Sequence, residues 1–195
     1  MQTRSTIRQA VCCCVLAMIA LPVLPQTGAA KSVHRATLYD AAVFNDRAAV
    51  ERLLAHNPAS VNQGDPWGFT PLHGVAGEEH TAMARLLIAR GANVNSANHE
   101  GTTPLHLAAS AEMAKLLVGA GAAIEARDHG GNTPLHSATE HPDMQDVMAQ
   151  LLTMKADANA ANKAGMTPLD MALNRQERDK VTLLQRYGAR RGKAR

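Results

Sequence analysis

Aromatic residues are scarce in this chain, and cysteine is confined to its first segment. Only 3% of the 195 residues are aromatic, although 46% are apolar. Alanine, leucine, valine and methionine must therefore build the core, which favours small, close-packed helices over the core of a typical globular enzyme. The three cysteines are consecutive, from Cys12 to Cys14. No later part of the chain can form a disulfide or supply a thiol nucleophile.

The first thirty residues have the pattern of a secretory signal peptide. Two arginines precede an apolar run over residues 10–24, and residues 28–30 are small, as a signal peptidase requires. The run is short for a membrane span and contains Pro22. We therefore predict a Sec-type signal peptide over residues 1–30 with cleavage near Ala30, export to the periplasm or secretion, and no membrane attachment after cleavage.

The charge of the remaining chain is nearly balanced. Two of the 20 basic residues lie in the first thirty, which leaves 18 against 17 acidic residues and a net charge of +1. This balance argues against nucleic acid as the general partner. Basic residues gather only at the end, at Arg186, Arg190, Arg191, Lys193 and Arg195. We expect the basic tail, residues 191–195, to be a frayed and solvated terminus, with a binding arm as the alternative.

A short motif returns four times with a period near 33 residues. Glycine stands two residues before the threonine of each copy. Threonine before proline favours a helix start, because the hydroxyl caps free N–H groups and proline at the first helical position loses no useful donor. The preceding glycine permits a turn with positive φ. The copies are Thr70-Pro71-Leu72-His73, Thr103-Pro104-Leu105-His106, Thr133-Pro134-Leu135-His136 and Thr167-Pro168-Leu169-Asp170.

A second helix is predicted after each motif. Apolar residues recur there on one helical face, and glycines at Gly91, Gly121 and Gly188 are placed to end the helices in the left-handed conformation. A degenerate first copy, without Thr-Pro, begins near Leu38, as expected for a terminal repeat. In the last copy Asp170 should complete a capping box.

This unit of turn, short helix, second helix and extended finger resembles the ankyrin repeat. The resemblance covers residues 34–190. It implies an all-α solenoid of about five helix-turn-helix repeats with short β-turn or hairpin fingers. The predicted repeats are residues 34–64, 65–97, 98–127, 128–161 and 162–190.

Two repeats depart from the pattern. Repeat three is three residues short after Ala108, so its first helix or connecting loop must be truncated, leaving a notch. In repeat four Lys155 stands where a helix-ending glycine belongs, and positive φ at a lysine costs about 1 kcal/mol. Pro142 is expected in the loop between the two helices of that repeat.

The resemblance implies that a protein partner binds to the fingertips and to exposed residues of the inner helices. Trp67 is the first candidate, because the only tryptophan lies in a turn and interface hot spots are enriched in this residue. The alternative is that Trp67 folds over the first repeat as a lid. The predicted binding residues are Pro66, Trp67, Phe69, Glu78, His99, Glu100, His129, Glu140, His141, Lys163 and Arg175.

The histidines suggest no metal or cofactor site. The histidines of the repeated motif, His73, His106 and His136, are expected to be structural, as they are in the family. His99 and His129 are expected to be ordinary surface, with sensing of pH or of a partner carboxylate as the alternative. No second ligand cluster accompanies residues 78–80.

No catalytic motif is present, so we expect a binding protein and not an enzyme. The leading hypothesis is a scaffold or adaptor in the bacterial periplasm, acting as a monomer. An inhibitor or immunity protein that occludes one enzyme or toxin is an alternative. Another is an accessory protein for an oxidative-stress enzyme, suggested by nine methionines, although Met83, Met113 and Met148 lie at core positions. An effector acting in a host cell would not carry this leader.

Overall fold

The computed structural model describes residues 37–192, in which nine α-helices, two 3-10 helices and no strand are found. The predicted all-α class is confirmed. The predicted signal peptide and the last three residues of the tail lie outside the described residues. No helix in the described range is long and apolar enough to cross a membrane. The elements are α2 (Leu38–Val43), α3 (Arg47–His56), η1 (Pro58–Asn62), α4 (Pro71–Gly77), α5 (Thr81–Ala89), η2 (Pro104–Leu107), α6 (Ala111–Gly119), α7 (Pro134–Glu140), α8 (Gln145–Thr153), α9 (Pro168–Asn174) and α10 (Arg178–Arg186).

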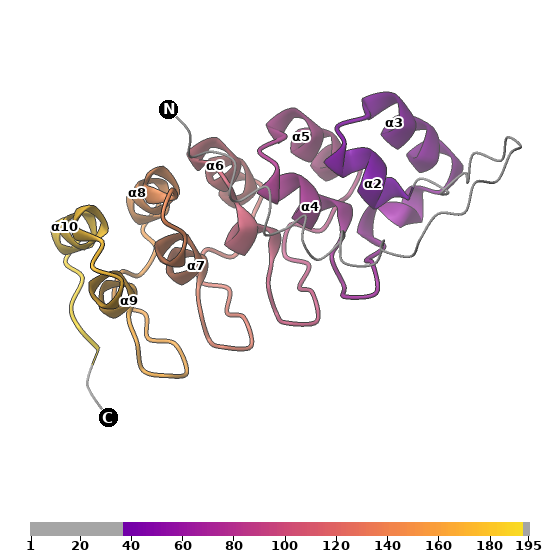
Figure 1. Cartoon of the computed structure of the whole chain (residues 1–195). Coiled ribbons are helices and arrows are strands. Elements are labelled where there is room, and N and C mark those ends of the chain that lie inside the picture. Colours follow the sequence, from indigo (N-terminus) through magenta and orange to yellow (C-terminus); the bar gives the residue numbers. More distant parts are fainter. Residues whose placement is uncertain (1–36, 193–195) are drawn as a thin grey trace, which may run out of the picture. The chain divides into compact units, whose positions relative to one another are not determined.

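The helices form five pairs stacked in sequence order (Figure 1). The first members of the pairs, which we call the inner helices, are α2, α4, η2, α7 and α9. The outer helices are α3, α5, α6, α8 and α10. Between successive pairs the chain runs out and back in a long loop, the finger, and the fingers project side by side from one side of the stack. The predicted solenoid of helix pairs is therefore confirmed.

Two columns of leucine form the centre of the stack. No repeat could bury its apolar face alone, so each column is shared between neighbouring repeats. The methionines at Met83, Met113 and Met148 are fully buried beside these columns, so they serve packing. The inner column is Leu72, Leu105, Leu135 and Leu169, and the outer column is Leu87, Leu117, Leu151 and Leu184.

Each repeated motif begins an inner helix, as predicted, and each start has a capping box, which was predicted for the last copy alone. In repeat two the main-chain N–H of Thr70 donates to Nδ1 of His73 (3.1 Å). In repeat five Asp170 replaces the histidine and accepts from the N–H of Thr167 (3.0 Å). An imidazole nitrogen and a carboxylate oxygen thus do the same work at the helix start.

The predicted departures in repeats three and four are present. The first helix of repeat three is reduced to the single 3-10 turn η2, and Ser110 then caps α6 by accepting from the N–H of Met113 (3.2 Å). Lys155 has φ of +69°, where Gly91 and Gly121 have +89° and +93°. Pro142 lies in the loop between α7 and α8, as expected.

A buried lysine, which the sequence analysis did not single out, joins the last two repeats. Lys180 is 2% exposed and occupies the position in α10 that Met83 has in α5. Its Nζ donates to the carbonyl oxygens of Thr139 (2.8 Å) and His141, and it pairs with Glu177 (2.6 Å). The ammonium therefore satisfies carbonyl groups at the end of α7 that would otherwise be left without a donor.

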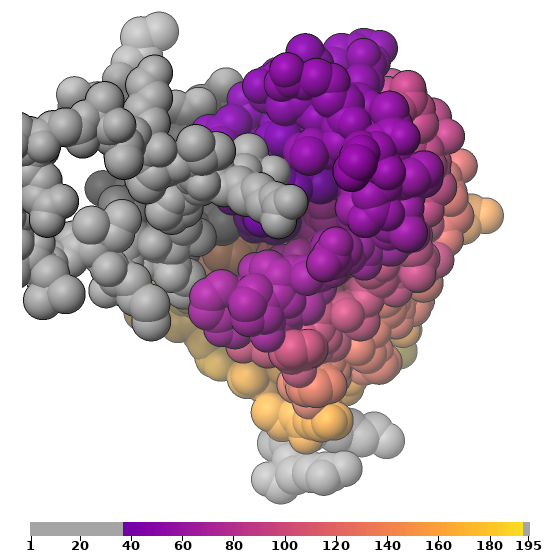
Figure 2. Space-filling view, turned by 90° about the vertical axis from the view of Figure 1, so that its right-hand side faces the viewer, coloured from indigo at the N-terminus to yellow at the C-terminus, as the bar shows by residue number. Residues whose placement is uncertain are grey.

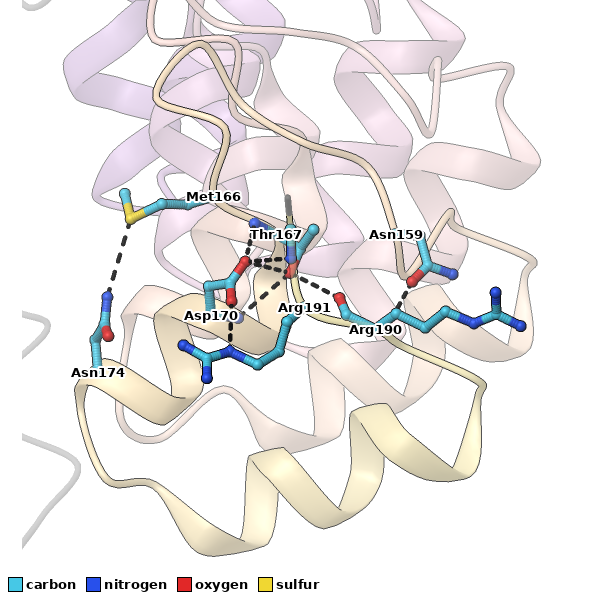
Figure 3. Close-up of polar contacts among 8 residues, drawn as sticks. Asn159, Met166, Thr167, Asp170, Asn174, Arg190 and Arg191 are labelled. Atoms are coloured by element: carbon cyan, nitrogen blue, oxygen red, sulfur yellow. Dashed lines mark hydrogen bonds and ion pairs between the residues drawn. The ribbon is translucent and has the colours of Figure 1, made fainter. Parts of the chain in front are cut away.

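The expectation of a frayed tail is wrong for Arg191 and Gly192, the part of the tail that the structure describes, which continue a docked segment from Ala189. The N–H of Arg190 donates to Oδ1 of Asn159 (2.7 Å), and the N–H of Gly192 donates to Oδ2 of Asp170 (2.8 Å). The first of these bonds repeats the one between Asn93 N–H and Asn62 Oδ1 (2.7 Å). The main chain here enters the position that a fifth finger would occupy, beside the fourth finger (Figure 3).

Candidate functional site

The tip of each finger is a tight turn organised by its first residue. In the first tip Oδ1 of Asp65 accepts from the N–H groups of Trp67 and Phe69, both at 2.9 Å. The turn closes when the N–H of Gly68 donates to the carbonyl oxygen of Asp65 (2.9 Å). The sequence analysis missed this role, although an Asp or Asn three residues before each turn glycine is a usable signal. The residues in this role are Asp65, Asn98, Asp128 and Asn162.

The four tips are joined into one row by main-chain hydrogen bonds. The N–H of His99 donates to the carbonyl oxygen of Trp67 (3.0 Å), and the N–H of His129 donates to that of Glu100 (2.8 Å). The N–H of Lys163 likewise donates to Gly130 (2.9 Å). At the first tip Pro66 takes the same position and has no N–H to offer, which closes that edge of the row to further pairing. The row therefore presents its side chains from a fixed backbone.

Two features require glycine at the tips: the positive φ of these residues and the close approach between neighbouring tips. A Cβ built on Gly101 would lie 3.0 Å from the main-chain nitrogen of His129, and one built on Gly131 would lie 2.9 Å from that of Lys163. A Cβ on Gly165, in the fourth tip, meets nothing within 4 Å, because no further tip packs against it in the described residues. The tips could not pack at this distance with any larger residue.

Most of the predicted binding residues lie exposed along the two edges of the inner face. Trp67 is 58% exposed, so its ring is not enclosed in the way that the lid alternative would require. Phe69 is half-buried, with its ring against the edge of His73 (centroids 5.7 Å apart), and Glu78 is half-buried after α4. The exposed members on the tips are Pro66, Trp67, His99, Glu100, His129 and Lys163, and those at the ends of inner helices are Glu140, His141 and Arg175.

The floor between these edges in repeats one and two is formed by α2 against α4. Tyr39 and Val43 pack onto Gly74, where a Cβ would come within 3.0 Å and 2.5 Å of their side chains. Burial raises the pKa of Tyr39, and the nearby carboxylates of Asp65 and Glu78 raise it further. The phenol thus faces a negative environment between the first fingertip and the end of α4.

The most exposed large apolar side chain in the described range is Phe44, at 81%, and the sequence analysis did not select it. It follows α2, at the position that Glu78 has in repeat two and Arg175 in repeat five. The missing Thr-Pro motif made this repeat hard to align, although the matching turn residues Asn45 and Glu79 both have positive φ. Phe44 therefore belongs to the helix-end edge of the inner face.

The motif histidines join neighbouring repeats and are not available to a ligand. Nε2 of His73 donates to the carbonyl oxygen of Thr102 in the next repeat (3.0 Å). The equivalent bonds run from His106 to Asn132 (3.1 Å) and from His136 to Met166 (3.2 Å). Burial lowers the pKa of each of the three imidazoles, against the opposing effect of these carbonyl oxygens.

The exposed side chains of the inner face include aromatic, imidazole and charged groups, which can contact a partner. Among the described residues no three His, Cys, Asp or Glu side chains are grouped so as to hold a metal ion. A broad opening lies at the end of the stack, between the fourth finger and residues 188–192, and it is open to solvent. Three residues that line the opening, Thr167, Gly192 and Arg191, are bonded to the carboxylate of Asp170 (Figure 3).

Comparison with known families gives one match. A family model described as ankyrin repeats (three copies) matches residues 38–128 and again residues 110–192. No curated protein is significantly similar to the chain. The family is generally non-catalytic, and its repeats typically bind other proteins.

Proposed function

Because the chain belongs to the ankyrin repeat family, we propose that it is a non-catalytic scaffold or adaptor that is exported to the periplasm and binds a partner protein through its inner face. The observation that carries this proposal is Trp67. More than half of this residue is exposed, on a fingertip where its N–H is bonded to Asp65 and its carbonyl oxygen to His99 of the next tip. An exposed tryptophan on a rigid support loses little entropy on binding, which is the property of an interface anchor.

The charge balance and the leader support the same proposal. The chain after residue 30 is nearly neutral, so a nucleic acid is not the partner that its charge favours. The leader pattern and the lack of later cysteines suit an exported protein whose stability does not depend on thiol oxidation.

The binding part of the proposal is tested by crosslinking in the periplasm of cells that produce either the natural protein or Trp67→Ala. The partner should be recovered with the natural protein and lost with the variant. Tyr187→Ala is the matched control, because Tyr187 is also an exposed aromatic residue (44%) but follows the outer helix α10. Equal recovery with Trp67→Ala would remove Trp67 from the binding site.

The recovered partner then distinguishes a scaffold from an inhibitor. A scaffold should bind it weakly or bind several clients, whereas an inhibitor should form a tight one-to-one complex that abolishes the partner's activity. Isothermal titration of the purified pair gives the stoichiometry and Kd.

Export is tested separately by fusing residues 1–35 to alkaline phosphatase, which is active only after export. An active fusion is expected. An inactive fusion would contradict the periplasmic location and leave the binding proposal standing.

A further inference from the structure

Charged side chains are distributed unevenly between the two sides of the first four repeats. Residues 38–162 contain seven lysine and arginine residues. Six of them lie in or directly after outer helices, and these are Arg47, Arg52, Arg85, Arg90, Lys115 and Lys155. The seventh, Arg127, lies on a finger, where its guanidinium donates to the carbonyl oxygens of Gly131 and Ala161, both at 2.8 Å.

The inner side of the same repeats carries carboxylates instead. They lie in α2, in the fingertips and in the loops that follow the inner helices. None of Glu78, Glu79 and Glu100 takes part in an ion pair with a described residue. Apart from Arg127, whose guanidinium is bonded to finger carbonyl groups, the charged residues of the inner-helix ends and fingertips are thus negative across four repeats. The residues are Asp40, Asp65, Glu78, Glu79, Glu100, Asp128, Glu140 and Asp143.

The exposed aromatic residues of the described repeats one and two lie on this acidic side. Phe44 and Trp67 stand on its two edges, and the Tyr39 phenol lies between them among carboxylates. An aromatic face beside a carboxylate suits a lysine or arginine side chain, whose alkyl stem packs on the ring while its charge meets the acid. Figure 2 looks along the stack from this end, with later repeats behind the first.

The charge reverses in repeat five. Its fingertip carries Lys163, its inner helix is followed by Arg175, and the adjoining tail contributes Arg190 and Arg191. Arg175 pairs with Glu177 (3.1 Å) and Arg191 with Asp170 (3.3 Å), so Lys163 and Arg190 are the two cations of this set outside the ion pairs of the described residues. A uniformly acidic surface would serve only solubility, but here the acidic stretch has a definite end. A bound segment would therefore meet attraction for positive charge over four repeats and repulsion at the fifth.

We propose that the inner face of repeats one to four binds an extended protein segment rich in lysine or arginine and interspersed with apolar residues. This proposal rests on the proposed function, since it names the chemistry of the partner of that same face. The apolar residues of the segment pack on Phe44 and Trp67, and its cations lie along the carboxylates of the fingertips and helix ends.

The test is selection of peptides from a random library of 12-residue sequences displayed on phage, with the purified protein as bait. Selected sequences should be enriched in lysine and arginine. Their binding, followed as synthetic peptides through the fluorescence of Trp67, should weaken as salt is added. The double variant Glu78→Gln/Glu100→Gln should raise Kd roughly threefold to tenfold at low salt, from two partly exposed charge pairs.

The control is Glu51→Gln/Glu112→Gln, which removes two acidic charges from outer helices and should leave Kd unchanged. Circular dichroism confirms that both double variants are folded. If the selected peptides are acidic or uncharged, and bind the natural protein but not Trp67→Ala, the basic-segment proposal is overturned and the proposed function is left intact. Recovery of no peptide that depends on the inner face would also overturn it, whereas failure of the proposed function shows separately in the crosslinking experiment.

Discussion

At the scale of single residues, the three motif histidines work only as neutral imidazoles. Nδ1 of His106 accepts from the N–H of Thr103 (3.2 Å), so the ring proton must be on Nε2, which donates to Asn132 (3.1 Å). A proton added to Nδ1 would face the threonine N–H, and the hydroxyl oxygen of Thr103 (2.9 Å) could accept it only by giving up its own donation to that nitrogen. Protonation therefore opposes the capping box, and burial opposes the added charge, whereas the bond from Nε2 to the carbonyl oxygen of the next repeat favours it.

The free energy of unfolding should consequently fall as the pH is lowered through the range in which an ordinary histidine titrates. The pKa of each motif histidine is lowered in the folded chain, so below pH 6.5 the unfolded chain binds protons that the folded chain does not. The loss should be on the order of 1 kcal/mol per histidine at one pH unit below 6.5. Urea unfolding at pH 7.5, 6.5 and 5.5 measures it.

A His106→Asn variant supplies the control for this titration. It should be less stable at pH 7.5, yet lose less stability on acidification because one of the three linked groups is gone. A free energy of unfolding that is the same at pH 7.5 and 5.5 would show that these imidazoles are not held neutral.

Fingertip glycines offer a second comparison at this scale. Gly101→Ala and Gly165→Ala impose the same positive φ, near +77°, but only the first brings a Cβ against the main chain of the next tip. Positive φ should cost about 1 kcal/mol in both, and the clash should add a further 1–3 kcal/mol to Gly101→Ala. Thermal unfolding of the two variants measures the difference. Equal losses would mean that the tips are not tightly packed.

At the scale of elements, asparagine side chains connect the bases of neighbouring fingers. Oδ1 of Asn95 accepts from the N–H of Ala123 (2.8 Å), and its Nδ2 donates to the carbonyl oxygen of Gly121 (3.0 Å). Glu125 takes this position before repeat four and can only accept, from the N–H of Asp157 (2.8 Å). The carbonyl of Lys155 therefore lacks the donor that the equivalent glycines have, and the same residue bears positive φ.

Lys155→Gly should raise the stability of the chain by about 1 kcal/mol, because the left-handed conformation costs glycine nothing. Differential scanning calorimetry should show a higher melting temperature. Lys155→Ala is the control: it removes the same charge and keeps the backbone strain, so it should give no such gain. An equal rise in both variants would attribute the effect to charge.

The repeats could be predicted from local sequence signals, whereas contacts between residues far apart in the sequence could not. Thr167 and Asp170 are three residues apart, so their capping box could be inferred from spacing. Lys180 finds its acceptor in Thr139, 41 positions earlier, and no local pattern shows a lysine replacing a core methionine. The tail looked frayed from its charge alone, since its partners at Asn159 and Asp170 follow only from the stacking of the last finger.

The candidate binding residues also divide into those that local signals predict and those that they do not. Their places on fingertips follow from the period of the repeats, because each tip has the same phase. Phe44 was missed because the first repeat lacks the motif that fixes this phase. The separation of charge between inner and outer faces is likewise invisible until each residue is assigned to a helix of known orientation.

At the scale of the whole molecule, a stack of repeats is held together by neighbouring interfaces, so each end is stabilised from one side only. The last repeat has no successor to cover Leu173, which is partly exposed, whereas Ala76 at the same place in α4 is fully buried. Residues 189–192 compensate by occupying the beginning of the next finger. The last repeat should therefore depend on this short segment more than on any single internal contact.

Gly192→Ala tests that dependence with one methyl group. A Cβ at this position would clash with the carbonyl oxygen of Gly165, so the segment must move away and lose the bond from Gly192 to Asp170. Hydrogen exchange should speed up in α9 and α10, by an amount equivalent to about 1–2 kcal/mol, and stay unchanged in α4 and α5. In the control Gly119→Ala the methyl group meets nothing within 4 Å. In a stack coupled through neighbouring repeats, loss of the docked segment must destabilise the final repeat first. Unchanged protection of α9 in Gly192→Ala would therefore show that this repeat is stable without the docked segment.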